Sequence, residues 1–172
     1  DGITFEGPAD STVDEDNFIV TNPNTSISTT GNLGITAPSG DNGYTLSFTT
    51  TPTNSLGEPL TSDGKKITYI LNGNTITAIR EGDNKTVFEI KLNKNSAGGS
   101  DDSYTYTQYE NIDHPIKGIV GIDPLIDDNI VLNFGFKITD QGQTSPLVEF
   151  KVKVNDSLPN AINKTYDINE DK

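Results

Sequence analysis

The sequence predicts an all-β fold, an antiparallel two-sheet β-sandwich, with a closed barrel as the lesser alternative. Apolar and polar residues alternate along several runs, which is the pattern of strands that bury one face. Turn-forming residues separate these runs at short intervals, as they do in sandwiches of antiparallel strands. Thr, Asn, Gly and Ser are abundant, and no stretch has the period of about 3.6 residues that an amphipathic helix requires.

The clearest strand pair spans Asn129 to Val154. In both halves every second residue is apolar, so each half is expected to bury one face. The polar turn from Asp140 to Pro146 joins the two strands, and Pro159 prevents further pairing after them. The apolar positions are Ile130, Leu132, Phe134, Phe136 and Ile138 in the first strand, and Val148, Phe150, Val152 and Val154 in the second.

Shorter strands precede this pair. The strongest local signal is Asn72-Gly73 between two β-rich runs, because the tight hairpin turn that favours Asn-Gly needs positive φ at both turn residues. Residues 109–128 lack periodicity and are expected to form a long crossing loop. The other strands are expected at 67–71, 74–79, 87–92 and 104–107, with a further strand at 44–48, a short one at 18–20 and weak ones near 27 and 33–35.

This pattern divides the chain into three parts. Residues 1–16 are expected to be an N-terminal linker, because Gly7-Pro8 interrupts regular structure and acidic residues crowd behind it. Residues 17–156 are the predicted β-sandwich domain. Residues 157–172 are expected to be an exit linker and the start of the next unit of a longer protein.

The chain carries a formal net charge of -13. Nucleic acid and anionic membranes are therefore not expected as partners, because both require Lys and Arg. The acidic residues either keep the protein soluble or are grouped to hold cations, which would relieve their mutual repulsion. With no cysteine and one histidine, zinc and iron–sulfur sites are not expected. No apolar run approaches the roughly 20 residues of a membrane span.

An acidic motif occurs twice in the chain. Glu15-Asp16 recurs as Glu170-Asp171, and the segments before them, Thr12–Asp14 and Asp167–Asn169, are also similar. Self-similarity at a fixed period is the mark of a tandem array. We therefore expect one repeat followed by the start of another, with a chance echo in an acidic chain as the alternative.

Three blocks stand out in order along the chain. They are Leu60–Tyr69, then Tyr104–Thr107 with Ile112–Pro115, and finally Leu132–Asp140 continued through Val152–Asp156 to Pro159. Together, over about residues 12–160, they resemble the tandem repeat domain of giant RTX-type adhesins that bacteria export by type I secretion. The resemblance implies an immunoglobulin-like β-sandwich, repeated many times, that holds an adhesive tip away from the outer membrane. It also implies calcium at the joints between repeats.

The expected calcium ligands lie near the two ends of the chain. Calcium takes six to eight oxygen ligands, and the exit segment Asn155–Asn160, which is similar to a cadherin linker, supplies too few alone. Acids on the far side of the joint would complete the site, and the acids after the N-terminal linker would do the same with a preceding domain. A solvated acidic linker is the alternative. The expected ligands are Asp14, Glu15, Asp16, Asp156, Asn169, Glu170 and Asp171.

Three further places are candidates for a metal or catalytic site. Asp113-His114-Pro115 holds the only histidine, and nothing pairs it with a nucleophile, so a structural role is expected in which Asp113 caps a turn. In the family's turn after Asp140 several aspartates are usual, whereas Gln141 and Gln143 stand here, so a metal in that turn is not expected. A loop calcium site is a weaker alternative, formed by Asp113, Asp123, Asp127 and Asp128.

These features predict a structural extender repeat of a secreted bacterial surface adhesin, stiffened by calcium and serving cell adhesion and biofilm formation. Its expected partners are neighbouring repeats of the same chain, and an isolated repeat is expected to be a monomer. No enzyme activity is expected, since no pair of carboxylates stands out as an acid and base. The alternative is a module that binds sugar or protein through Tyr104, Tyr106 and Tyr109, although core packing explains these tyrosines better.

Overall fold

The computed structural model describes residues 2–18, 26–37, 43–94, 101–114 and 129–156. Within these ranges the chain is all-β, as the sequence predicts, and its helical segment is a short 3-10 helix, η1 (Glu15–Phe18). No helix in the described part of the chain has the length and apolar character needed to cross a membrane.

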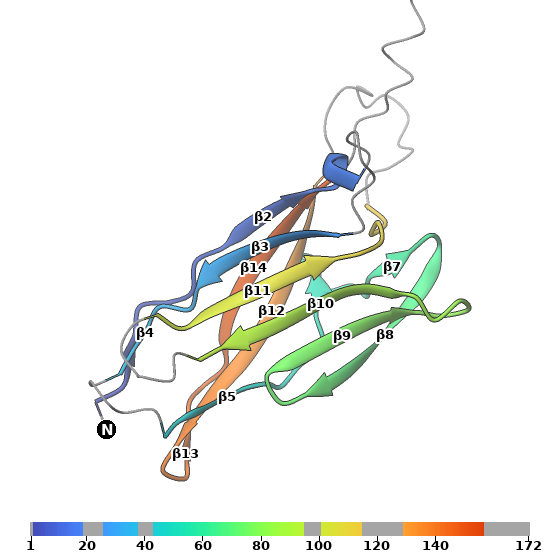
Figure 1. Ribbon diagram of the computed structural model, residues 1–172. Coiled ribbons are helices and arrows are strands. Elements are labelled where there is room, and N and C mark those ends of the chain that lie inside the picture. The colour runs from blue at the N-terminus through green and yellow to red at the C-terminus, as the bar shows by residue number, and fades with distance from the viewer. Residues whose placement is uncertain (1, 19–25, 38–42, 95–100, 115–128, 157–172) are drawn as a thin grey trace, which may run out of the picture.

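The strands follow one another along the chain as labelled in Figure 1. Their bounds are β1 (Thr4–Phe5), β2 (Ser11–Asp14), β3 (Ile27–Asn32), β4 (Ile35–Thr36), β5 (Thr45–Phe48), β6 (Thr53–Asn54), β7 (Thr61–Ser62), β8 (Lys65–Asn72), β9 (Thr75–Arg80), β10 (Thr86–Asn93), β11 (Ser103–Gln108), β12 (Asn129–Asp140), β13 (Gln143–Thr144) and β14 (Val148–Asn155).

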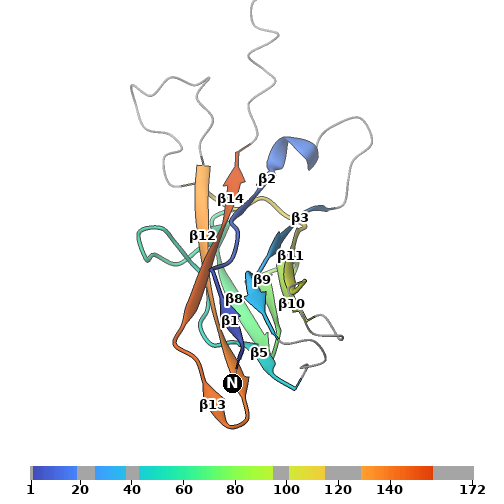
Figure 2. The same cartoon turned by 90° about the vertical axis from the view of Figure 1, so that its left-hand side faces the viewer.

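The described strands form two six-stranded sheets and a small sheet of β1 and β4. One large sheet has the order β3-β11-β10-β9-β8-β7 and is antiparallel throughout. The other has the order β13-β12-β14-β2, with β5 and β6 paired to the free side of β12. The two large sheets face one another (Figure 2). The prediction of purely antiparallel pairing is wrong at one place, because β2 runs parallel to β14.

The predicted strand pair is confirmed as β12 and β14, which pair antiparallel from Asn129 opposite Asn155 to Phe136 opposite Val148. Their alternating apolar residues face the other sheet and form the core. Phe134 lies at its centre, with its ring centroid 6.0 Å from that of Phe88 and 5.4 Å from that of Phe150. Aromatic pairs at such separations add to the stabilisation that burial alone gives.

Two of the tyrosines weighed as sugar contacts belong to this core. Tyr104 and Tyr106 are fully buried on β11. The Tyr104 ring stacks on Phe150 at 4.1 Å between centroids, and the Tyr106 ring meets Phe134 edge-on at 6.2 Å. The expectation that core packing explains these residues is confirmed, and of the three only Tyr109 is exposed.

The hairpin at Asn72-Gly73 exists, but its turn lies one residue further along than the sequence predicts. Asn72 pairs with Thr75, so the two turn residues are Gly73 and Asn74, and of these only Gly73 has a positive φ, at 61°. Asn74 is fixed from outside the hairpin, because its Nδ2 donates to Leu92 O at 3.0 Å and its carbonyl accepts from Leu92 N at 2.8 Å. Pairing with β10 therefore decides the register.

The segment predicted as an N-terminal linker is part of the fold. It contains β1 and β2, and Val13 is 5% exposed in the core. The predicted strand start at Phe18 falls instead in η1. Because β2 is short and polar, its own sequence gives almost no period-two signal, and it becomes a strand by pairing with the edge of β14. The chain begins near the β13 turn and leaves β14 at the opposite end of the molecule (Figures 1 and 2). We call this second end the exit end.

Candidate metal centre

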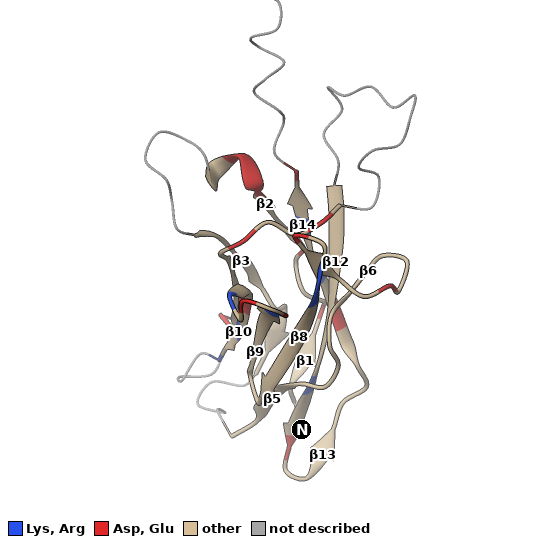
Figure 3. Cartoon of the chain, turned by 90° about the vertical axis from the view of Figure 1, so that its right-hand side faces the viewer, with Lys and Arg blue, Asp and Glu red and all other residues tan. Residues whose placement is uncertain are grey.

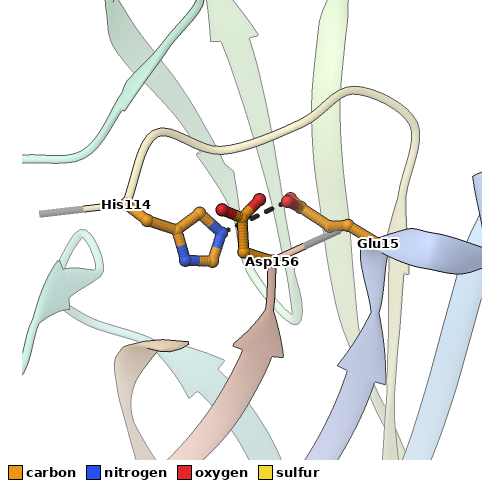
Figure 4. A group of neighbouring side chains, drawn as sticks. All are labelled: Glu15, His114 and Asp156. Atoms are coloured by element: carbon orange, nitrogen blue, oxygen red, sulfur yellow. Dashed lines mark hydrogen bonds and ion pairs between the residues drawn. The ribbon is translucent and has the colours of Figure 1, made fainter. Parts of the chain in front are cut away.

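Three potential metal ligands meet at the exit end. The parallel pairing places Asn155 opposite Asp14, so the next residues, Glu15 and Asp156, leave their strands side by side. His114 follows β11 and reaches the same place. One ligand atom from each of Glu15, His114 and Asp156 lies within 4.8 Å of the others, and Figure 4 shows the three side chains directed toward one another.

The carboxylate of Glu15 is buried and firmly oriented. The residue is 1% exposed, and its Oε2 accepts hydrogen bonds from Gln108 Nε2 at 2.6 Å and from Ile112 N at 2.9 Å. Its Oε1 lies 3.2 Å from His114 Nε2. Two donors therefore hold one oxygen, and the other oxygen faces the imidazole.

A second layer of hydrogen bonds holds Gln108. Tyr106 Oη donates to Gln108 Oε1 at 2.6 Å, and Gln108 Nε2 also donates to the carbonyl of Glu110 at 3.0 Å. Burial, and to a lesser degree the negative charge of Glu15, raises the pKa of Tyr106 well above its usual value. The hydroxyl therefore stays protonated and remains a donor, which fixes the amide of Gln108 with its NH₂ toward Glu15.

The histidine is buried, and its neighbour Asp113 anchors the segment that carries it. His114 is 5% exposed, and its buried Nδ1 has no hydrogen-bond partner among the described residues. Asp113 accepts from Thr61 Oγ1 at 2.7 Å, from Asp63 N at 3.1 Å and from Gly64 N at 2.9 Å. The expectation that Asp113 caps a turn is thus confirmed, and the turn is the Asp63-Gly64 hairpin between β7 and β8.

The three ligand residues line a polar cavity of about 290 Å³. Among the described residues that line it, Arg80 is the one with a permanent positive charge. Its guanidinium binds Asp83 at 2.8 Å, Ser62 Oγ at 3.1 Å and Glu110 at 3.3 Å. The hydrogen bonds and charge of Arg80 lower the pKa of Asp83 to about 2. Arg80 is thus directed to other partners than Glu15.

Asp14, the last residue of β2, faces a different hollow from Glu15, the first residue of η1. Asp14 Oδ1 accepts from Asp16 N at 2.9 Å and so fixes the start of η1. Asp14 also lines a hollow of about 390 Å³ together with Asn17 and Asn155. Within the described part of the chain, the buried Oδ1 of Asn155 has no hydrogen-bond partner. Every donor atom that these three side chains could give to a cation is an oxygen.

The structure gathers four of the residues predicted to bind calcium, Asp14, Glu15, Asp16 and Asp156, at the exit end. The sequence led us to expect that Asp14, Glu15 and Asp16 would serve the joint with a preceding domain, but they lie beside the exit strand of their own domain. The remaining predicted ligands and the acids of the alternative loop site lie outside the described residues; these are Asn169, Glu170, Asp171, Asp123, Asp127 and Asp128.

Sequence reasoning missed three participants, His114 in one cavity and Asn17 and Asn155 in the other. The parallel pairing of β2 with β14 brings Asn155 to Asp14, and the polar sequence of β2 gives no sign of that pairing. His114 reaches Glu15 through the segment after β11. Comparison with family models, with curated proteins and with solved structures gives no match. Arguments about function therefore rest on the residues of this chain.

Proposed function

We propose that this chain is one extender repeat, an immunoglobulin-like β-sandwich, of a secreted bacterial surface adhesin that serves cell adhesion and biofilm formation. One observation carries the proposal beyond the sequence resemblance. The described chain starts at one end of the molecule and leaves at the other (Figures 1 and 2). Units with this arrangement join end to end, so that each repeat adds its own length to a rod.

Calcium at the exit end is the second part of the proposal. Acidic side chains gather on η1 and at the end of β14 (Figure 3). The hollow beside Asp14 offers carboxylate and amide oxygens, which are ligands that calcium prefers. One of them, Asn155 Oδ1, has no hydrogen-bond partner among the described residues. Three side chains fall short of the six to eight oxygens that calcium takes, so water and the following unit would supply the others.

We propose that a different set of acids meets at each joint from the set that the sequence suggested. Glu15 and Asp16 follow β1 and β2, which lead from the first end of the molecule to the exit end. In a second unit with this fold, Glu170 and Asp171 would hold the equivalent place, one domain length beyond Asp156. The proposed joint after this repeat therefore uses Asp14, Asp16 and the exit strand, and the acids near residue 170 would serve the next joint.

Calcium would act mechanically in such a joint. It neutralises carboxylates that otherwise repel one another, and it ties the exit strand to the start of η1. Because the ion binds the folded state alone, it also stabilises that state, by about 2.7 kcal/mol at a hundredfold excess over its dissociation constant. That is a large share of the roughly 5–15 kcal/mol that holds a typical domain together.

A chain of two successive repeats provides the test. We expect calcium to raise its melting temperature and to lengthen it in solution scattering, and EDTA to reverse both effects. Asp14→Asn should reduce both responses, whereas the matched control Glu149→Gln, which alters an exposed carboxylate near the start of β14, should leave them unchanged. If EDTA changed neither the melting temperature nor the particle length measured by solution scattering, the proposal of a calcium-stiffened rod would be refuted.

A ligand-binding module of the same kind of adhesin is the alternative function. The observation in its favour is a hollow of about 520 Å³ at the end opposite the exit, lined by Ile3, Phe5, Ile138 and Gln143 among others. Phe5 is 43% exposed there, and an exposed aromatic ring beside polar groups suits a sugar or a peptide. If glycan or peptide arrays bound the wild-type protein but not Phe5→Ala, the result would favour a ligand-binding module over an extender repeat.

A further inference from the structure

We propose that Glu15, His114 and Asp156 form a binding site for a divalent transition metal of the zinc class, separate from the calcium hollow beside Asp14. The inference does not depend on the adhesin function. It starts from ligand chemistry, because one imidazole nitrogen and two carboxylate oxygens converge here from three separate segments of the chain.

The ligand set selects the class of metal. Calcium and magnesium bind oxygen ligands almost exclusively. Zinc accepts histidine nitrogen and carboxylate oxygen together, and three protein ligands with a water in the fourth position is a common arrangement. No cysteine exists in the chain, so a thiolate site of the finger type is not an option. A nitrogen and two oxygens suit zinc, and also cobalt as its spectroscopic substitute.

The spacing of the ligand atoms fits such an ion after a small movement. Bonds of about 2.0–2.2 Å at tetrahedral angles separate two ligands by about 3.3 Å, and Glu15 Oε1 lies 3.2 Å from His114 Nε2. No pair of the three ligand atoms is more than 4.8 Å apart. Asp156 therefore has at most about 1.5 Å to close, and it is half-buried at the end of β14, where a side chain can adjust.

The buried part of the site is already built. Gln108 and the backbone of Ile112 hold Glu15 Oε2, and Tyr106 holds Gln108. Hydrogen bonds of this kind from an outer layer keep a metal-binding carboxylate in place and raise the affinity for the ion. The same bonds leave Glu15 Oε1 facing His114. This oxygen is the one that would bind a metal.

Electrostatics favour a cation at this place. Glu15 is buried, and Asp156 brings a second carboxylate close to it. Two neighbouring carboxylates, one buried and one half-buried, repel each other, and a divalent ion offsets that repulsion better than one imidazole does. Arg80, the permanently charged residue among the described lining, is bound to Asp83 and Glu110.

One feature limits the affinity. A metal on Nε2 leaves the ring proton on Nδ1, and Nδ1 of His114 is buried without a hydrogen-bond partner. Metal-binding histidines usually donate that proton to an acceptor, and loss of the acceptor weakens binding. We therefore expect micromolar rather than nanomolar affinity for zinc. Binding would pin the ends of β2 and β14 to the segment after β11.

The test uses the 172-residue chain without an affinity tag, titrated with Zn²⁺ in a calorimeter while calcium is held in excess. We expect one ion per chain, and Co²⁺ in its place should give the strong visible absorption of a four-coordinate site. His114→Gln should weaken Zn²⁺ binding at least about tenfold and abolish the Co²⁺ absorption. Zinc binding that is absent, or that survives in His114→Gln, would overturn the proposal.

A second variant covers the case in which His114→Gln fails to fold. Asp156→Asn alters a half-buried residue at a strand end, so it should fold, and we expect it to weaken Zn²⁺ binding by a similar factor. Unchanged zinc affinity in Asp156→Asn would contradict the assigned ligand set. The calcium test measures a different variant, Asp14→Asn, in a chain of two successive repeats. The proposed zinc site and the proposed calcium joint can therefore fail independently.

Discussion

Asp14 and Glu15 are neighbours in the chain, yet they lie in opposite surroundings. Asp14 faces an open hollow whose potential ligand atoms are all oxygen, whereas Glu15 faces a buried cavity that contains the one imidazole of the chain. The two residues stand at the boundary between β2, which ends at Asp14 and pairs parallel with β14, and η1, which begins at Glu15. An acidic cluster in a sequence can thus divide between two places with different sets of potential ligand atoms.

The largest expected effect is the loss of Glu15. Glu15→Ala removes the acceptor of Gln108 Nε2 and of Ile112 N, so that the buried Ile112 N loses its acceptor and Gln108 Nε2 keeps only its bond to the carbonyl of Glu110. We expect the free energy of unfolding to fall by about 3 kcal/mol, measured by urea denaturation. The matched change Asp14→Ala removes the oxygen that accepts from Asp16 N and should cost about 1 kcal/mol. Equal losses in the free energy of unfolding would contradict the difference between the surroundings of Asp14 and Glu15.

The outer layer of hydrogen bonds gives a smaller effect that sharpens the contrast. Tyr106→Phe removes the donor to Gln108 Oε1, and we expect a loss of about 1–2 kcal/mol with a zinc affinity about tenfold weaker. Tyr104→Phe is the control, since the Tyr104 hydroxyl forms its hydrogen bonds with Ala9 O and Ser11 Oγ instead. If Tyr104→Phe weakened zinc binding as much as Tyr106→Phe, both effects would come from a general loosening of the core.

The smallest expected effect concerns a third carboxylate, Asp83, which pairs with Arg80 of the cavity lining. Arg80 lowers the pKa of Asp83 from 3.8 to about 2, so this pair stabilises the fold above pH 3.8. The contribution is lost as the pH falls through the folded pKa of about 2. Acid titration of unfolding should show a shallower decline in Asp83→Asn between these two values. An unchanged slope would mean that the pair is equally formed in the unfolded chain.

The sequence predicted the core far better than the exit end, for a physical reason. Ile130 to Val154 alternate so regularly that burial of one face is the only favourable arrangement, and the structure has it. The segment Ser11–Asp14 has one buried apolar residue, Val13. Its pairing depends on a partner far along the chain, which local periodicity does not encode.

The candidate site was predicted in part, and the missing part depends on the same pairing. The acids Asp14 and Asp156 were expected to bind a metal, and the structure brings them to one end of the molecule. His114 was expected to be structural, since a lone histidine has no partner that sequence spacing can reveal. Its proximity to Glu15 arises only when the chain after β11 crosses the ends of β2 and β14.

The parallel pairing of β2 and β14 has a consequence when the two ends of the chain are pulled. Tension would draw β2 toward the first end and β14 toward the exit, so the two strands would slide past one another along their common axis. The hydrogen bonds between Ser11–Asp14 and Val152–Asn155 would then have to break together instead of peeling apart one by one. An ion bound to both Glu15 and Asp156 would brace this pair at the point where the pull on β14 enters.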